Sequence, residues 1–398
     1  MANIGGKYFI QDELDTVAPH HASFKTLWET KWKQPCAMGV YPFMFGAIQD
    51  FEPVAADIIK KGLKEPYDWD EYAKCFFPKA EELVKQAVAA ENDGQREKAS
   101  ELYLLVTTCA CISAFVLMLH EFPMIQVDIP HTNRIEGEGQ VLPGFYHLPA
   151  EASNSHRVPL VIIFTGLDGY RTELAVWKEG WRQVGCATLI VEIPGTGDNP
   201  GAPSDPTSPD RVWDSMFEWI AKQDAIDQAQ IVNWGFSTGG YYSIRLAHTH
   251  AKKLKGVVAH GGGCHYMFSP EWLEHADTRE YPFDLAHTLC HKFGYGTDFE
   301  RFKKEAINRY SLLYDGTLDK SCTKLLLVNG MNDGIFPIDD YYLCLQHGGP
   351  KEARFVPNEE HMGEPQSFFI ILNWLAKLLD FKIDTGRFMS TIPSKPKF

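Results

Sequence analysis

One serine in this sequence stands in a setting that suggests chemistry. Residues 235–239, GFSTG, match the G-x-S-x-G nucleophile elbow, in which a strand turns sharply into a helix and exposes the serine hydroxyl. A helix that begins after Ser237 would place backbone N–H groups where the oxyanion of an attacked carbonyl forms. The motif predicts a nucleophilic serine, with a surface Gly-Ser loop as the alternative.

An acid and a base that could activate this serine follow it in the chain. A serine hydroxyl is a weak nucleophile until a base takes its proton and an acid orients that base. Asp333 follows the apolar segment KLLLVNG, and His361 follows the last predicted strand in ARFVPNEEHMG. The order Ser, Asp, His is that of α/β-hydrolase triads. We predict the triad Ser237, Asp333 and His361, with Asp339 and Asp340 as the competing acids.

The loop after the predicted strand 159–165 should supply part of an oxyanion hole. We expect one backbone N–H from Gly166 or Leu167 and the other from Thr238. Asp168 and Tyr170 in the same loop are candidate substrate contacts, although Asp168 could simply cap a turn.

A histidine-rich glycine turn gives three more candidate substrate contacts, His260, His265 and Tyr266. A structural turn with a hydrogen-bonded histidine is the alternative for this segment. The spacing of the two histidines and Cys264 matches no common zinc pattern, so we predict no metal site. The triad chemistry requires no cofactor.

The elements around these residues predict the fold. Continuous apolar runs at 159–165 and 187–193 are typical of strands buried in a parallel sheet. Further strands are expected at 124–130, 144–148, 256–260, 324–329 and 353–356, with helices at 211–223 and 366–379 and a helical insertion at 272–314. The alternation predicts a doubly wound, mostly parallel sheet, with the catalytic residues at the carboxyl ends of its strands.

The first 122 residues have a helical pattern rich in aromatic side chains, which we interpret as core. Segments 72–91 and 93–105 predict a helical hairpin, broken at an Asn-Asp-Gly turn. We therefore predict two domains, a helical cap or lid over 1–122 and a catalytic domain over 123–398.

Segment 102–119 carries no charge and reaches the lower length limit of a membrane span. The polar residues Thr107, Thr108 and Ser113 lie inside it, and no Lys/Arg cluster flanks it, so a buried helix is the prediction.

Charge and cysteine usage restrict the partners and the compartment. A net charge of −14 over 398 residues argues against nucleic acid or an anionic membrane as the main partner. The nine cysteines contain no C-x-x-C pair, and the first residues show no secretory pattern. We expect a cytoplasmic protein, with an endosomal or vesicle-associated location as the alternative. A homodimer through the N-terminal helices is a further expectation.

Several segments resemble those of fungal heptaketide hydrolyases of the yellowish-green pigment type. They are GFSTGGYYSIRLAHTH, FTGLDGY, EIPGTGDNP, SPDRVWDS, AHGGGCHY, EYPF and NDG…HMG, and the likeness extends to DTVAPH, LWETKWK and VYPF near the N-terminus. Such proteins lie in the FrsA-like esterase branch of the α/β hydrolases. They have a helical N-terminal domain. Between about residues 104 and 122 they have a longer, charged helical segment, where this chain is uncharged through Leu119.

The resemblance implies a substrate and a reaction. The chain would shorten a heptaketide naphthopyrone by hydrolysing a carbon–carbon bond, giving 1,3,6,8-tetrahydroxynaphthalene for fungal pigment and dihydroxynaphthalene-melanin biosynthesis. Carried over by position, it implies the same triad. A carboxylesterase or thioesterase acting on another polyketide or an aryl ester is the alternative, because one triad serves any acyl transfer. A non-catalytic binding protein on this scaffold would usually lack the nucleophile or the base, and both are present.

Overall fold

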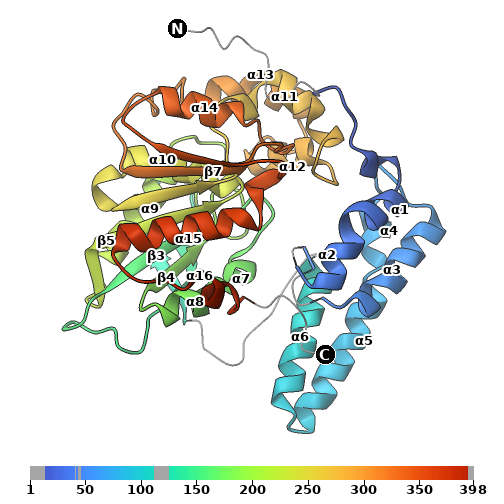
Figure 1. The fold of residues 1–398 in the computed structure, drawn as a ribbon. Helices are drawn as coiled ribbons and strands as arrows, with labels where there is room; N and C mark the ends of the chain where they lie inside the picture. The colour runs from blue at the N-terminus through green and yellow to red at the C-terminus, as the bar shows by residue number, and fades with distance from the viewer. Residues whose placement is uncertain (1–13, 41, 44–45, 112–124, 393–398) are drawn as a thin grey trace. The chain divides into compact units, whose positions relative to one another are not determined.

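The computed structural model describes residues 14–40, 42–43, 46–111 and 125–392. Contacts divide the chain into two compact units, one formed mainly by Ile125–Met389 and the other mainly by Val17–Met124 (Figure 1). The proposed functional division into a cap or lid over 1–122 and a catalytic domain over 123–398 stays a prediction.

The larger unit folds around an eight-stranded sheet. The strand order is β1-β2-β4-β3-β5-β6-β7-β8; β2 is antiparallel to both of its neighbours, and the other pairs are parallel. The strands are β1 (Ile125–Pro130), β2 (Val141–His147), β3 (Val158–Phe164), β4 (Ala187–Val191), β5 (Ile226–Phe236), β6 (Gly256–His260), β7 (Lys324–Gly330) and β8 (Glu352–Val356). The prediction of a mostly parallel, doubly wound sheet is confirmed.

Burial explains why some strands stand out in the sequence as continuous apolar runs and others do not. In β4 and β6 every residue is buried, and β3 is buried except at Pro159, so each shows as a continuous apolar run. Strand β2 alternates buried and less buried positions and begins at Val141, earlier than the predicted segment 144–148. Its alternation is that of a strand near a sheet edge with one face on the core.

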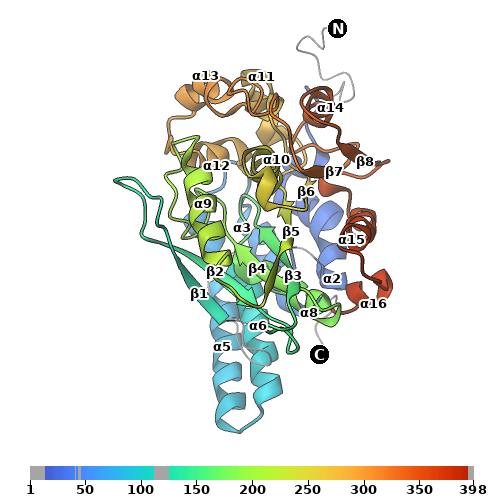
Figure 2. The ribbon, with the colours of Figure 1, turned by 90° about the vertical axis from the view of Figure 1, so that its left-hand side faces the viewer.

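Helices cover both faces of the sheet (Figure 2). Helices α9 (Ser208–Ile220) and α10 (Thr238–Thr249) lie on one face, and α8 (Trp177–Gln183) and α15 (Gln366–Leu379) on the other. On α9 the buried Val212, Met216 and Ile220 recur every four residues and form its apolar stripe.

Shorter elements complete this unit. The insertion predicted at 272–314 is helical: it includes most of α11 (Pro270–His275) and all of α12 (Leu285–Lys292) and α13 (Phe299–Tyr310), so this prediction is confirmed. The remaining elements are α7 (Arg171–Leu174), η3 (Ala251–Lys253), η4 (Tyr266–Phe268), α11 (Pro270–His275), η5 (Ala276–Thr278), α12 (Leu285–Lys292), α13 (Phe299–Tyr310), α14 (Asp339–Gln346), η6 (His361–Gly363) and α16 (Thr385–Met389).

The smaller unit is helical and has an aromatic core. Trp28, Trp32, Phe43 and Phe51 are buried and meet edge to face, with ring centroids 5.0–6.2 Å apart. Its elements are η1 (Pro19–Ala22), α1 (Phe24–Leu27), η2 (Trp28–Trp32), α2 (Lys33–Met38), α3 (Ile48–Lys61), α4 (Trp69–Lys74), α5 (Phe77–Asn92) and α6 (Arg96–Cys111). Helices α5 and α6 form the predicted hairpin, cyan in Figure 1.

The uncharged segment 102–119 is described only as far as Cys111, where α6 ends. The prediction of a buried helix over its remaining residues lies outside the described part of the chain. Within the described residues, no helix combines the length and the apolar content that crossing a membrane requires.

Candidate active site

Ser237 lies at the turn between β5 and α10, as the motif predicts. Its φ of 53° and ψ of −123° are an uncommon conformation for a residue with a side chain. A Cβ on Gly235 would lie 2.1 Å from Oγ of Ser243, and one on Gly239 would lie 2.3 Å from the Thr165 carbonyl oxygen. The two glycines are therefore required by close packing of the strand, the helix and the neighbouring loop.

The three residues of the predicted triad form one hydrogen-bonded line. Nε2 of His361 lies 2.9 Å from Oγ of Ser237, and Nδ1 of His361 lies 2.9 Å from Oδ2 of Asp333. They come from the ends of β5, β7 and β8, which are close because parallel strands present their carboxyl ends at one edge of the sheet. The structure brings the three together, and their catalytic roles stay predictions.

Asp333 is fully buried, and its two carboxylate oxygens accept hydrogen bonds from four groups. Oδ1 accepts from the backbone N–H groups of Ile335 and Phe336, at 2.7 and 2.9 Å. Oδ2 accepts from Nδ2 of Asn329, at 2.6 Å, as well as from His361. The carboxylate is therefore held with one oxygen directed at the imidazole.

The competing acids lie elsewhere. Asp340 accepts from the backbone N–H groups of His265, Tyr266 and Met267, at 2.6–3.0 Å, and so holds the turn after β6. Asp339 is buried in the first turn of α14, where burial raises its pKa to about 6.

Glu280 belongs to the same site, although we assigned it no role from the sequence. Its carboxylate accepts from the backbone N–H of His361, at 3.0 Å to each oxygen, and from that of Gly334, at 2.9 Å. It thus joins the turn that carries Asp333 to the turn that carries His361. The segment EYPF contributes to the resemblance, but its place within a helical insertion gives no signal of this contact.

The electrostatic environment favours a charged imidazole at His361. Burial opposes the positive charge, but the carboxylates of Asp333 and Glu280 outweigh it and raise the pKa of His361 above its ordinary value. Burial and the nearby Asp333 raise the pKa of Glu280 to about 7. His361 is therefore easier to protonate than a free histidine.

The predicted oxyanion loop lies against the serine. A Cβ on Gly166 would lie 3.3 Å from Cβ of Ser237, so the backbone there is within reach of an oxyanion formed at the serine. Leu167 and Thr238 are buried, and Thr238 begins α10. Gly166 thus lies close to Ser237 and Thr238 follows the serine directly, and the donor roles of Gly166, Leu167 and Thr238 stay predictions.

Two candidate substrate contacts follow in this loop. Asp168 is exposed and its Oδ2 accepts a hydrogen bond from the Tyr281 hydroxyl, at 2.6 Å. Tyr170 is half-buried and precedes α7.

The histidines of the glycine turn have protein partners. Nε2 of His260 lies 2.8 Å from the Met362 carbonyl oxygen, and its Nδ1 accepts from Nε1 of Trp234 at 3.4 Å. Burial lowers the pKa of His260 to about 3, so the ring is neutral. This geometry favours a structural turn with a hydrogen-bonded histidine over a substrate contact by His260. Through Met362, His260 supports the loop that carries His361.

His265 and Tyr266 differ in their exposure. His265 is buried, its Nδ1 lies 2.6 Å from Oγ of Ser311, and burial lowers its pKa to about 4. Tyr266 is half-buried. Substrate contact by either residue stays a prediction.

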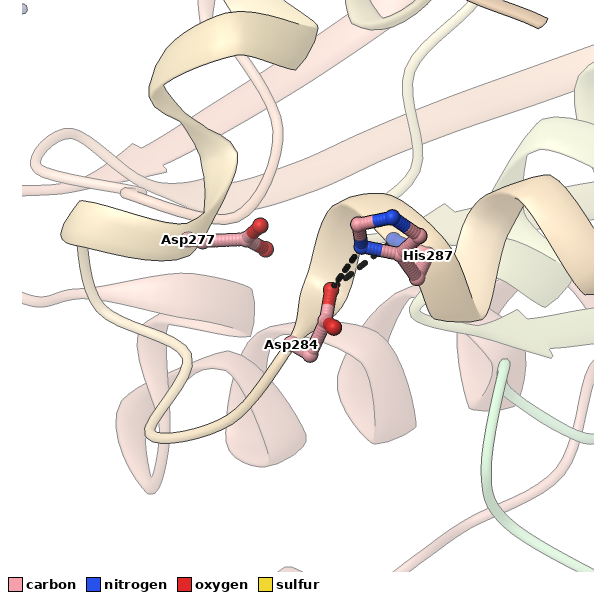
Figure 3. Close-up of side chains that lie close together, drawn as sticks. All are labelled: Asp277, Asp284 and His287. Atoms are coloured by element: carbon pink, nitrogen blue, oxygen red, sulfur yellow. Dashed lines mark hydrogen bonds and ion pairs between the residues drawn. The ribbon is translucent and has the colours of Figure 1, made fainter. Parts of the chain in front are cut away.

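One group of side chains in the described chain has the composition of a metal site. Ligand-type atoms of Asp277, Asp284 and His287 lie within 4.8 Å of one another (Figure 3). Asp284 caps α12 and accepts from Nδ1 and the backbone N–H of His287, at 2.8 and 3.0 Å. Asp277 accepts from the backbone N–H of Ala286, at 2.7 Å. Capping of the helix accounts for the arrangement, and the prediction of no metal stays a prediction.

The fold, with a serine on a tight strand-to-helix turn beside a histidine and an acid, is that of an α/β hydrolase. Residues 124–379 match the family described as "Esterase FrsA-like". The chain therefore belongs to the FrsA-like esterase family.

The curated relatives agree with this placement. Esterase FrsA of Photorhabdus laumondii is 25% identical over 211 residues, which are 50% of this chain and 46% of that protein. Esterase FrsA of Yersinia pestis is 21% identical over 285 residues, 71% of this chain and 61% of that protein. The matches thus span between 46% and 61% of these relatives' length.

Two solved structures are similar in fold. 2,6-dihydroxy-pseudo-oxynicotine hydrolase has a TM-score of 0.60 and 16% identity, over 85% of this chain and 95% of that chain. Wild-type AbyA5 has a TM-score of 0.58 and 15% identity, over 86% of this chain and 94% of that chain. At these identities the likeness concerns the fold alone.

Proposed function

We propose that this chain is a serine hydrolase in which Ser237 attacks a carbonyl carbon. The observation that carries the proposal is the line of two 2.9 Å hydrogen bonds from Ser237 through His361 to Asp333. His361 takes the hydroxyl proton as general base, while Asp333 fixes the tautomer with Nε2 facing the serine. Backbone N–H groups of Thr238 and of Gly166 or Leu167 bind the oxyanion. No cofactor takes part.

For the substrate we propose a heptaketide naphthopyrone, on the strength of the resemblance to fungal heptaketide hydrolyases. Attack on a side-chain carbonyl gives a tetrahedral adduct, which collapses by breaking the bond between the carbonyl carbon and the aromatic part. The ring reacts in its keto tautomer, in which the carbon that carries the side chain also bears a hydrogen. The electrons of the broken bond therefore enter the ring as a phenolate, whose oxygen takes a proton from His361. Water, activated by His361, then releases the acyl group from Ser237 as a carboxylic acid. The other product is 1,3,6,8-tetrahydroxynaphthalene.

A carboxylesterase or thioesterase is the second candidate, and the names of the relatives favour it. The curated relatives are called esterases, and the same triad acts on any activated acyl group. The two candidates differ only in the leaving group, an alkoxide or thiolate instead of a stabilised carbanion.

Mass spectrometry of the protein incubated with the naphthopyrone separates the candidates. Loss of an acetyl or acetoacetyl unit with the native protein, but not with Ser237→Ala, would establish carbon–carbon hydrolysis by this serine. Cleavage of an aryl ester alone would assign the esterase function. Inactivity on both, with no labelling of Ser237 by a fluorophosphonate, would overturn the serine-hydrolase proposal.

A further inference from the structure

A lysine is buried beside the predicted oxyanion loop. Lys292, the last residue of α12, is 3% exposed. Its Nζ donates to the Pro194 carbonyl oxygen, at 2.5 Å, and to Oγ1 of Thr196, at 3.0 Å. Within the described part of the chain no carboxylate forms an ion pair with it; instead, Nζ lies 5.2 Å from the ring centre of Tyr242. A buried lysine without an acid costs stability.

Thr196 continues the hydrogen-bonded chain to the oxyanion loop. Its Oγ1 lies 3.0 Å from the Leu167 carbonyl oxygen and 3.5 Å from that of Gly166. A charged Lys292 is a donor and cannot accept a hydrogen bond. The threonine oxygen therefore accepts from Lys292, and the hydroxyl proton is directed at these carbonyls. Burial lowers the pKa of Lys292 well below its ordinary value, but even a neutral amine keeps the two N–H groups that the two contacts need.

The orientation of these carbonyls determines where the loop's N–H groups point. The Gly166 carbonyl and the Leu167 N–H belong to one planar trans peptide, in which C=O and N–H point in opposite directions. The longer contact of Thr196, 3.5 Å to the Gly166 carbonyl oxygen, therefore bears on the direction of the Leu167 N–H. The shorter hydrogen bond, 3.0 Å to the Leu167 carbonyl oxygen, fixes the peptide that follows Leu167 and so the path of the loop.

The backbone at Lys292 packs closely against the loop that carries Thr196. Gly195 has a φ of +80°, and a Cβ there would lie 2.1 Å from the Lys292 carbonyl oxygen. The Pro194 carbonyl also accepts from the hydroxyl of Tyr242, at 3.3 Å, on the helix that begins after the serine. Lys292 thus joins the oxyanion loop, the loop after β4 and helix α10 in one buried set of contacts.

We propose that Lys292 and Thr196 are positioning residues for the oxyanion hole, acting through the carbonyls of Gly166 and Leu167. The proposal rests on the serine-hydrolase function and goes beyond it, because neither residue contacts Ser237, His361 or Asp333 in the triad's hydrogen bonds. A misdirected donor weakens binding of the developing oxyanion but not of the ground-state substrate. The loss should therefore fall on kcat, with KM nearly unchanged.

The test compares Thr196→Val, Thr196→Ser and Lys292→Met with the native protein on an aryl ester. Removing an oxyanion donor outright lowers kcat about 10²–10³-fold, so a misdirected donor should lower it by about 10–100-fold. We expect this for Thr196→Val and Lys292→Met, and recovery to within about threefold in Thr196→Ser, which keeps the hydroxyl. Binding of a trifluoromethyl ketone, whose hydrated or serine-bound form carries the oxyanion, should weaken in parallel.

Matched controls separate positioning from stability. Thr323→Val removes a hydroxyl that donates to the Leu254 carbonyl oxygen, at 2.9 Å, at the amino-terminal edge of the sheet. Lys255→Met removes a lysine that donates to Gln230 at the same edge. Both should lower the melting temperature without changing kcat. If Lys292→Met does not fold, the comparison of Thr196→Val with Thr196→Ser decides.

The outcomes distinguish this proposal from the function on which it rests. Rapid fluorophosphonate labelling of the native protein, with none for Ser237→Ala, supports the serine hydrolase. If Thr196→Val and Thr196→Ser then keep the native kcat and the native affinity for the ketone, the positioning role is overturned while the serine hydrolase stands. A loss of kcat equal in both threonine variants would also overturn it.

Discussion

At the scale of single residues, the bonds around Asp333 explain why the identity of this acid matters. One oxygen accepts from two backbone N–H groups, and the other accepts from the side chains of Asn329 and His361. All four partners are donors. An asparagine at this position would present an N–H₂ group to at least one donor. The acid therefore fixes both the local turn and the tautomer of the histidine.

The first prediction concerns this acid. Asp333→Asn should lower kcat about 10⁴-fold, because an amide facing Nδ1 stabilises the wrong tautomer of His361. Steady-state kinetics on an aryl ester measures the loss. Asp319→Asn, at an exposed acid paired with His347, should leave kcat unchanged. A loss of less than tenfold in Asp333→Asn would assign the orienting role to another residue.

The second prediction concerns the pH profile. His361 must be neutral to act as a base, so kcat/KM should rise with pH through its raised pKa, with the acid limb at a higher pH than an ordinary histidine gives. Glu280→Gln removes one of the carboxylates that raise this pKa, and the acid limb should move to lower pH. A limb that stays in place, measured from pH 5 to 9, would show that Glu280 acts only through its hydrogen bonds.

At the scale of elements, the site depends on how closely α10 approaches the ends of β3 and β6. The serine N–H donates to the His260 carbonyl oxygen, at 2.7 Å, and the loop after β3 passes directly over the start of the helix. A serine in a strained conformation is maintained only while these neighbours hold it.

The third prediction tests this close approach. Gly239→Ala would place Cβ 2.3 Å from the Thr165 carbonyl oxygen, so helix and loop must separate. We expect a destabilisation of about 1–3 kcal/mol and a loss of activity, because the oxyanion loop moves with the backbone. Urea unfolding and ester turnover measure the two effects. Gly349→Ala, where a Cβ meets nothing within 4 Å, is the matched control and should be neutral.

At the scale of the whole molecule, the chain consists of two compact units with separate cores. Phe51 is buried in the aromatic core of the helical unit, and Leu327 is buried in β7 of the sheet unit. A core of this kind can support folding of its own unit.

The fourth prediction follows from the two cores. If the units are two folding domains, Phe51→Ala should destabilise the helical unit by about 3–5 kcal/mol and Leu327→Ala the sheet unit by about 2–5 kcal/mol. Each substitution should then move a different transition in urea unfolding followed by circular dichroism. Both variants moving one common transition would mean that the chain unfolds as a single cooperative body.

The sequence by itself determined the class of fold and the three residues of the predicted triad. Buried parallel strands such as β3 and β4 are apolar almost throughout, so they can be recognised as continuous apolar runs. The elbow has no room for side chains at Gly235 and Gly239, so it can be recognised by its two glycines. Asp333 and His361 follow the carboxyl ends of strands, and the loops at these ends lie along the same edge of a parallel sheet.

Only the tertiary structure decided the contacts that join distant segments. Glu280 lies on a helical insertion and meets the turns of Asp333 and His361 through backbone N–H groups, which any sequence provides. Lys292 and Thr196 are far apart in the chain, and a lysine at a helix end gives no sign that it will be buried. Hydrogen bonds to backbone atoms depend on the path of the folded chain rather than on the type of residue that carries them, so no spacing in the sequence could predict them.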